Sequence, residues 1–179
     1  MMTRLLISGG PGSGCTSTAR ALGERLGVPV VDSDDYFHKP TDPPFQEQYS
    51  LEERRALLRS VLDPEGSWIL SGSVATWGLH ALAPTHAIFL NTPKATRLQR
   101  LLDRQRTQFG RRIDPGGDMQ EEHGAFLKWA AGYEEREGAG RNLATDRGFL
   151  TAQCGRFVEL EGEVTVDEIV ARIEEFVGD

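Results

Sequence analysis

The sequence predicts a three-layer α/β domain built on a parallel sheet. Short apolar runs of strand length alternate with segments whose apolar residues recur at helical spacing. This alternation indicates βαβ units, whose right-handed crossovers place helices on both faces of the sheet. We find no internal repeat, low-complexity tract or linker in the 179 residues. We therefore expect a single domain that spans residues 1–179.

Five strands are predicted from apolar runs bounded by glycine, proline or acidic residues. They are expected at residues 4–8, 28–32, 67–73, 86–91 and 156–162. Most of the intervening segments carry helical periodicity, apart from a proline-rich loop at residues 38–49. Helices without a distinct start signal are expected at residues 16–27 and 141–150.

The remaining helices have recognisable start signals. Three are expected to open with a capping box, in which Ser, Thr or Asp is followed three residues later by Glu. The pairs are Ser50 and Glu53, Asp118 and Glu121, and Thr165 and Glu168. A fourth helix is expected to be capped by Thr92, with Pro93 at its first helical position.

Composition and charge narrow the classes of partner. At 39% hydrophobic and 26% charged residues, the chain resembles ordinary globular proteins. We see neither a signal peptide nor an apolar run long enough to cross a membrane, so we expect a cytoplasmic protein. The net charge of -7 disfavours general nucleic-acid binding, and Cys15 and Cys154 form no metal or disulfide pattern. The expected partner is a small molecule, with neither nucleic acid nor membrane, and the expected state is a monomer or homodimer.

The stretch Gly9–Thr16, GGPGSGCT, lies between the first predicted strand and the first predicted helix. Except at Cys15, it matches G-x-x-x-x-G-K-[ST], the pattern of a phosphate-binding loop. Such glycines let successive backbone N–H groups face an anion, and the helix N-terminus adds partial positive charge. A glycine-rich turn without a ligand is the alternative, but the strand–loop–helix context favours phosphate binding. The expected nucleotide contacts come from Gly9, Gly10, Gly12, Ser13, Gly14, Cys15, Thr16 and Ser17.

Two positions in this loop carry specific chemistry. The Thr16 hydroxyl stands where it would ligate Mg²⁺ on ATP. Cys15 stands where the pattern has lysine, and a thiol is mostly neutral near pH 7, while its thiolate has the wrong sign. Backbone dipoles can still hold the β-phosphate, so the missing charge bears more on catalysis than on binding. Another group must neutralise the transferring phosphoryl group.

The glycine loop and the following STARALGERLGVPVVDSDD resemble the start of the small nucleoside and nucleoside-monophosphate kinases, a group of P-loop proteins. The resemblance extends more weakly across nearly the whole chain. It implies a P-loop NTPase fold with strand order 2-3-1-4-5 and is nearest to adenylate-kinase-like or uridine-kinase-like proteins. Loops of such relatives often read G-S-G-T-S-T, and archaeal cytidylate kinases have threonine at the lysine position. Loss of the lysine therefore does not by itself imply an inactive enzyme.

Three carboxylates, Asp32, Asp34 and Asp35, follow the second predicted strand, at the edge where open α/β sheets bind ligands. The kinase group has a similar motif, in which one carboxylate supports the magnesium shell and another orients or deprotonates the acceptor. The resemblance assigns Asp32 to the metal and Asp34 to the acceptor, with Asp35 a competitor for both. The alternative is a solvated strand end. The neighbouring aromatic residues either stack on the acceptor or hold their loop down: Tyr36, Phe37, Phe45 and Tyr49.

The third predicted strand ends in Ser71-Gly72-Ser73, where many P-loop enzymes carry a Walker B aspartate. Gly72 would let a substrate approach the backbone, and either Ser71 or Ser73 could bond a substrate hydroxyl. Trp77 is a candidate wall of the acceptor pocket, although a lone tryptophan more often belongs to the core. The segment resembles the substrate segment of small-molecule kinases more than an ATPase motif.

An arginine-rich stretch follows the fourth predicted strand: Arg97, Arg100, Arg104, Arg106, Arg111 and Arg112. A solvated helix face is the usual interpretation of such a run. However, RLLDR from Arg100 to Arg104 resembles the R-L-x-x-R that opens the lid of the kinase group. That resemblance implies a lid at about residues 104–118, with Arg104 over ATP. We expect Arg111 or Arg112 to supply the charge that Cys15 lacks, because arginine bonds phosphate at two points and stays charged.

These residues together predict an ATP- and Mg²⁺-dependent kinase whose acceptor is a nucleoside or nucleotide. The catalytic candidates are Asp34, Arg104, Arg111 and Arg112, and the substrate-binding candidates are Asp35, Tyr36, Gly72, Ser73 and Trp77. One alternative is a nucleotide-binding sensor or interaction module that binds ATP without transferring phosphate. A second is a simple NTPase, which the acidic cluster, the lid and the missing Walker B aspartate argue against.

Overall fold

Five parallel strands form the sheet, in the order β2-β3-β1-β4-β5. The computed structural model describes residues 2–79 and 82–178. Its strands are β1 (Arg4–Gly9), β2 (Val30–Asp32), β3 (Trp68–Ser71), β4 (His86–Asn91) and β5 (Phe157–Glu161). The predicted fold class and strand order are confirmed.

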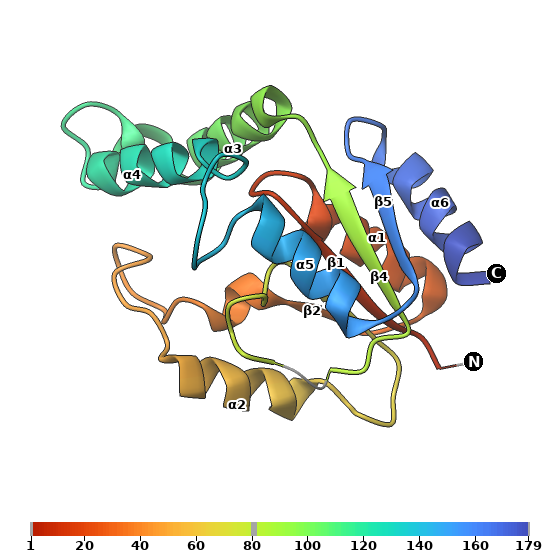
Figure 1. The fold of residues 1–179 in the computed structure, drawn as a ribbon. Coiled ribbons are helices and arrows are strands. Elements are labelled where there is room, and N and C mark those ends of the chain that lie inside the picture. Colours follow the sequence, from red (N-terminus) through yellow and green to blue (C-terminus); the bar gives the residue numbers. More distant parts are fainter. Residues whose placement is uncertain (1, 80–81, 179) are drawn as a thin grey trace.

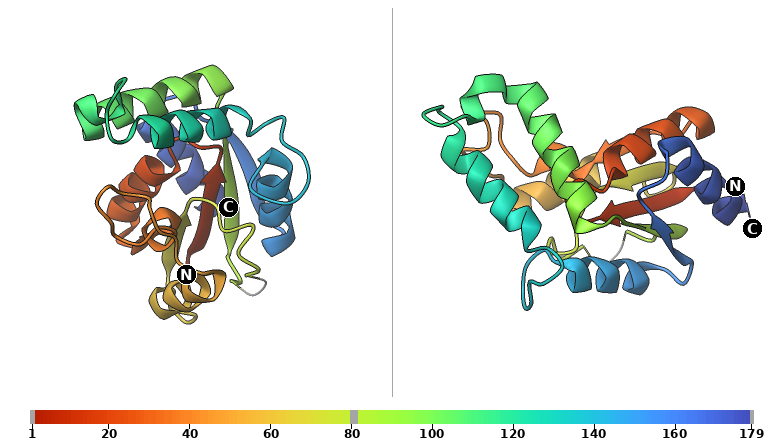
Figure 2. Two further views of the ribbon diagram at one scale, coloured as in Figure 1. Left: turned by 90° about the vertical axis from the view of Figure 1, so that its left-hand side faces the viewer. Right: turned by 90° about the horizontal axis from the view of Figure 1, so that it is seen from above.

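Helices cover both faces of the sheet. They are α1 (Cys15–Leu26), α2 (Leu51–Val61), α3 (Lys94–Phe109), α4 (Gln120–Ala131), α5 (Leu143–Gln153) and α6 (Val166–Gly178). Helices α1 and α6 lie on one face and α2 and α5 on the other, while α3 and α4 form a hairpin across the carboxyl ends of the strands (Figure 1, Figure 2). Within the described residues, none of these helices has both the length and the apolar character needed to cross a membrane.

Two apolar cores follow from the alternation of side chains along the strands. In β1, Leu5 and Ile7 pack with residues of α1 and α6, such as Leu22 and Ile173. Leu6 points to the opposite face, where it joins residues of α2 and α5. Burial on both faces therefore fixes the strands in the centre of the molecule and leaves their carboxyl ends free for a site.

Two of the predicted capping boxes are confirmed. The Ser50 hydroxyl accepts from the Glu53 N–H at 3.2 Å, and the Glu53 carboxylate accepts from the Ser50 N–H at 2.6 Å. The same reciprocal pair joins Thr165 and Glu168 at the start of α6. Both pairs satisfy backbone N–H groups that a helix leaves without partners in its first turn.

The other two predicted helix starts are wrong. Helix α4 begins at Gln120 without a side-chain cap, because the Asp118 carboxylate is bound by Arg112 at 2.7 Å. Helix α3 begins at Lys94, with Pro93 as its N-cap rather than its first residue. Thr92 does not cap the helix, since its hydroxyl donates to the Ser13 carbonyl at 3.3 Å and so contacts the glycine loop.

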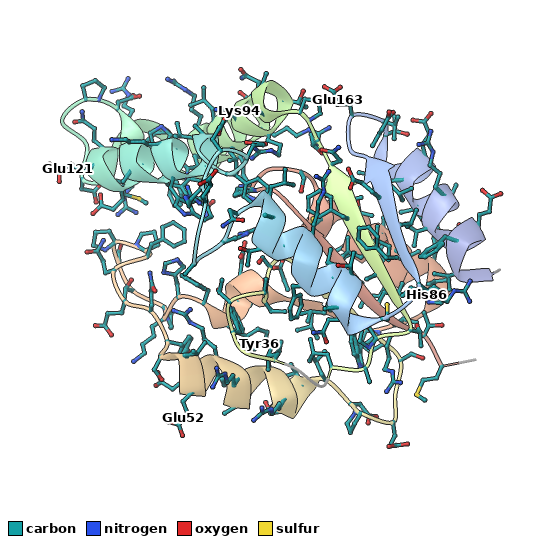
Figure 3. The ribbon with its side chains drawn as sticks, viewed as in Figure 1. Tyr36, Glu52, His86, Lys94, Glu121 and Glu163 are labelled. Carbon is teal, nitrogen blue, oxygen red and sulfur yellow. The ribbon has the colours of Figure 1, made fainter. Side chains whose placement is uncertain are left out.

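The α3–α4 hairpin reaches from the sheet toward the proline-rich loop. Lys94 marks its end near the sheet, close to Glu163, and Glu121 marks its outer end (Figure 3). A short 3₁₀ helix, η2 (Gly110–Ile113), lies at this outer end. There the Phe109 ring meets the Phe45 ring with centroids 6.1 Å apart. Residues 104–118, predicted as a lid, therefore include the last turns of α3 and the whole of η2.

Candidate functional site

The loop between β1 and α1 has the backbone geometry of an anion-binding loop. Gly12 and Gly14 have φ of 86° and 96°, a region that other residues rarely adopt. The Ser13 N–H donates to the Gly10 carbonyl at 3.0 Å, and no side chain caps α1 at Gly14. The first N–H groups of α1 are thus available to an anion at the helix N-terminus.

Helix α3 supports this loop from outside through an arginine that is almost fully buried. Arg97 is 1% exposed, donates to the Pro11 carbonyl at 2.8 Å and forms an ion pair with Glu134. Its guanidinium also lies 5.2 Å from the centre of the Tyr133 ring. Arg97 therefore has a structural role, since its guanidinium is buried and bound by the protein. Arg100, three residues later, is exposed and donates to the Ser13 carbonyl at 3.4 Å.

Cys15, at the lysine position, is buried and neutral. Its Sγ lies 3.3 Å from the Ser13 Oγ. Burial raises the pKa of the Cys15 thiol to about 11, against the lowering effects of the Ser13 hydrogen bond and the Arg141 charge. The side chain thus contributes no charge at neutral pH, as a thiol with this pKa keeps its proton.

Thr16 and Asp32, the two predicted metal ligands, are brought together. The Thr16 hydroxyl donates to Asp32 Oδ2 at 2.7 Å, and Asp32 Oδ1 accepts from the Asp34 N–H at 3.1 Å. Within the described residues, no group of three or more His, Cys, Asp or Glu residues could hold a metal ion. One hydroxyl and one carboxylate beside a phosphate loop nevertheless fit Mg²⁺, which takes hard oxygen ligands and completes its shell with water and substrate phosphates.

Asp34 lies next to this pair and faces positive charges. It remains exposed to solvent, yet surrounding protein desolvates it enough to raise its pKa above the usual value, and the negative charge of Asp32 raises it further. The charges of Arg141, Arg104 and His38 act in the opposite direction on the same pKa. Arg104, a predicted catalytic residue like Asp34, therefore opposes the rise in the pKa of Asp34, although no hydrogen bond or ion pair joins the two within the described residues.

The predicted substrate-binding residues are more dispersed. Asp35 is exposed, and Tyr36 is half-buried against the core below α5 (Figure 3). Gly72 has φ of 94° and lies against Ser33, so a side chain there would collide with that buried serine. The Ser73 hydroxyl donates to Asp146 at 2.5 Å.

Trp77 lies in the core rather than in an open pocket. It is 2% exposed, and its ring lies 6.4 Å from the Phe37 ring. The Arg54 guanidinium lies 3.8 Å from the centre of the Phe37 ring. Phe37 and Trp77 thus form part of the packing that holds the loop after β2 against α2.

The lid arginines lie at the outer end of the hairpin. Arg111 is exposed, and Arg112 binds Asp118 at 2.7 Å and Asp42 at 3.4 Å. Among the described residues, no hydrogen bond or ion pair joins Arg111 or Arg112 to the glycine loop. Their role in neutralising the transferring phosphoryl group stays a prediction.

A buried polar cluster that the sequence did not reveal lies directly beside the glycine loop. The Asp146 carboxylate, 1% exposed, accepts from the Tyr133 hydroxyl at 2.8 Å and from Ser73, and lies 3.5 Å from Arg141 Nε. Arg141 Nη2 donates to the Gly9 carbonyl at 3.0 Å. Burial raises the pKa of the Tyr133 hydroxyl and Asp146 raises it further, so that hydroxyl keeps its proton and donates. These residues belong to no recognisable sequence motif.

A cleft of about 310 Å³ adjoins the glycine loop on its outer side. Its walls are Ser13 and Gly14, the first turn of α1, Arg100 and the β5–α6 loop. Gly162 in that loop lies against Thr92, so an added side chain would push the two segments apart. The cleft therefore begins where the phosphate loop ends, which suits a ligand that extends away from its phosphates.

Comparison with known proteins places the chain in a family. Residues 5–122 match the AAA domain family AAA_18, which is more than half of the chain. The chain belongs to this family. It is also 29% identical to Uncharacterized protein YqaC of Bacillus subtilis (strain 168), over 99% of this chain and 98% of that protein.

Solved structures share the fold at low identity. A shikimate kinase from Bacteroides thetaiotaomicron is 20% identical, with 100% of both chains covered and a TM-score of 0.56. A gluconokinase from Sinorhizobium meliloti 1021 is 16% identical, with 98% of this chain and 95% of that chain covered and a TM-score of 0.52. At these identities the likeness establishes the fold.

Substituting Gly12 should show how tightly the loop packs against α3. A Cβ at Gly12 would lie 2.5 Å from the Arg97 carbonyl oxygen, and φ is positive, so Gly12→Ala should lower the free energy of unfolding by about 3 kcal/mol. Gly27→Ala is the matched control, because φ is also positive there but nothing lies within 4 Å; it should cost about 1 kcal/mol. Urea unfolding measures both, and equal costs would contradict the packing argument.

Alkylation rates should report the neutral state of Cys15. With a pKa of about 11, less than about one thiol in a hundred ionises at pH 8, so iodoacetamide should modify Cys15 far more slowly than free cysteine. In a Cys154→Ser background, mass spectrometry should show the rate rising about tenfold per pH unit between pH 7 and 9. A rapid rate that is independent of pH would mean that position 15 carries a thiolate.

Proposed function

We propose that the protein is an ATP-dependent kinase that transfers the γ-phosphoryl group to a small acceptor, a nucleoside or nucleotide. The observation that carries this proposal is the contact between Thr16 and Asp32, with Asp34 bonded to the same carboxylate. Through Asp32, the phosphate loop is connected to Asp34, whose own carboxylate remains free to act on an acceptor. A site that only held nucleotide would have no need of this second carboxylate.

The nucleotide would lie along the glycine loop. Its phosphates would accept hydrogen bonds from the loop and the first turn of α1, where the helix dipole favours negative charge. The base and ribose would extend into the cleft between Arg100 and the β5–α6 loop. This orientation directs the γ-phosphate toward Asp32 and Asp34 at the carboxyl end of β2.

Thr16 and Asp32 would hold Mg²⁺ together with the nucleotide phosphates. When bound, Mg²⁺ would offset negative charge on the β- and γ-phosphates. The protein's own contribution is a pair of oxygens 2.7 Å apart, one at the start of α1 and the other at the end of β2. Their separation shows that the hydroxyl and the carboxylate already face each other.

Asp34 would accept the proton of the acceptor hydroxyl. The acceptor oxygen then forms a bond to the γ-phosphorus, the bond from that phosphorus to the bridging oxygen breaks, and ADP leaves. The raised pKa of Asp34, caused by desolvation and by Asp32, makes its carboxylate a stronger base than an ordinary aspartate. The charges of Arg141 and Arg104 oppose this rise in the pKa of Asp34.

The region around Asp34 would be covered by the hairpin and the proline-rich loop. Phe45 meets Phe109, and Asp42 meets Arg112, so the tip of the hairpin already contacts that loop. Such a cover excludes water, which would otherwise compete with the acceptor. The same arrangement disfavours simple NTP hydrolysis.

Phosphoryl transfer from labelled ATP tests the proposal directly. The acceptors would be nucleosides and nucleoside monophosphates, together with shikimate, gluconate and small sugars, which the names of similar structures suggest. Asp34→Asn should lower kcat by about 10²- to 10⁴-fold, because it removes the base. Asp63→Asn, at the opposite end of the strands, is the control and should leave kcat unchanged.

The pH profile gives an independent check on Asp34. In the wild type, kcat/KM should fall as pH drops through a pKa above the ordinary value of an aspartate, because the protonated base cannot accept a proton. Asp34→Asn should lack that limb. Binding of ATP without transfer to any acceptor would favour the nucleotide-binding module instead.

Metal dependence provides another prediction. Asp32→Asn and Thr16→Val each remove one of the two oxygens, so each should raise the Mg²⁺ concentration needed for half-maximal ATP binding by about 10- to 100-fold. Thr151→Val, whose hydroxyl bonds only carbonyls within α5, is the control. Calorimetric ATP titrations at fixed Mg²⁺ concentrations would measure the shift. An unchanged dependence in both variants would place the metal elsewhere.

A further inference from the structure

We propose that Arg141 replaces the missing loop lysine and binds the terminal phosphate of ATP. This inference rests on the proposed function, since it assumes that the glycine loop holds ATP. It differs from the role predicted for Arg111 and Arg112, because Arg141 comes from the α4–α5 connection and contacts the loop without any closure of the hairpin. It also names a residue that no sequence motif identified.

The backbone of Arg141 is fixed on both sides. The following residue, Asn142, is 2% exposed and caps α5 by accepting from the Thr145 N–H at 2.8 Å. Arg136 donates to the Arg141 carbonyl at 2.7 Å. The side chain therefore starts from a defined point at the N-terminus of α5.

A buried acid then holds the guanidinium. Arg141 Nε lies 3.5 Å from Asp146 Oδ2, and Asp146 is itself held by Ser73 and Tyr133. A buried carboxylate without a cation would be costly, so the pair fixes the arginine as well as the acid. Arg141 is thus oriented before any ligand binds, which lowers the entropy that binding must overcome.

The charge lies where a loop lysine would act. Arg141 Nη2 donates to the carbonyl of Gly9, the first residue of the glycine loop. Gly9 is the last residue of β1, which lies in the centre of the sheet between β3 and β4. The guanidinium therefore lies at the carboxyl edge of the central strand, where the glycine loop begins.

Arg141 also retains donors for a ligand. Its side chain is 24% exposed. The structure records no partner for Nη1 anywhere in residues 2–79 and 82–178, so the N–H groups of Nη1 can bond phosphate oxygens. By contrast, Arg97 bonds the Pro11 carbonyl and forms an ion pair with Glu134, and Arg112 forms ion pairs with two aspartates.

Comparing the affinities for ATP and ADP measures the contribution of the terminal phosphate to binding. Calorimetric titration in Mg²⁺ would use the wild type, Arg141→Ala, Arg141→Lys and, as a control, Arg20→Ala, which removes an exposed arginine of α1. A hydrogen bond to a charged group corresponds to about 10- to 100-fold in affinity. Arg141→Ala should therefore lower the affinity for ATP by that factor and the affinity for ADP much less. Arg141→Lys should restore part of the lost ATP affinity. Arg20→Ala should bind both nucleotides like the wild type.

A second-site variant distinguishes charge from folding. Adding Cys15→Lys to Arg141→Ala returns a cation to the lysine position of the loop, so it should restore the preference for ATP over ADP. A purely structural loss could not be repaired in this way. Thermal unfolding of each variant would verify that the comparison is made on folded protein, and the conservative Arg141→Lys serves if Arg141→Ala does not fold.

The outcomes separate this inference from the proposed function. If the wild type binds ATP but Arg141→Ala leaves ATP affinity unchanged, weakens ATP and ADP equally, or is not rescued by Cys15→Lys, then Arg141 does not bind the terminal phosphate. A raised KM for the acceptor with unchanged ATP affinity would instead assign Arg141 to the acceptor and overturn the proposal. If the wild type binds neither nucleotide, the proposed function fails first.

Discussion

The buried carboxylate of Asp146 joins the elements around the candidate site. It accepts from Ser73 after β3 and from Tyr133 after α4, and it pairs with Arg141 at the start of α5. Because a buried charge without partners would be strongly destabilising, each of these contacts constrains the segment that supplies it. Through Arg141 the same acid is linked to the Gly9 carbonyl, so the glycine loop is positioned by the second half of the chain as well as by β1 and α1.

This arrangement explains why a cysteine can occupy the lysine position of the loop. A lysine at position 15 would share its surroundings with Arg141, whose charge already acts on that position. A neutral, buried thiol beside Ser13 avoids that repulsion. In the proposal, Arg141 at the start of α5 supplies the positive charge that Cys15 lacks, and Asp146 holds that charge in place.

The fold could be predicted because its signals are local. Strand and helix periods, together with the capping residues at Ser50 and Thr165, depend on nearby sequence, and the strand order followed from the family resemblance. The approach of Asp32 to Thr16 followed from topology, since both lie at the carboxyl edge of the sheet. Asp146 and Arg141 could not be found in this way, because the groups that position them, in Tyr133, Ser73 and Gly9, are 13 to 132 residues distant. The capping box at Asp118 failed for a different reason, since Arg112, only six residues away, binds that carboxylate instead.

The two sources of positive charge have different physical characters. Arg141 is held by a buried acid and bonds the glycine loop directly. Arg112 lies at the tip of the hairpin in exposed ion pairs with Asp42 and Asp118, and such pairs contribute only about 0–1 kcal/mol each. Exchanging those weak pairs for a phosphate would therefore be easy once an acceptor draws the hairpin inward. On this view Arg141 stabilises the bound nucleotide, whereas the predicted lid arginine adds charge only when the acceptor is present, so that transfer to water is disfavoured.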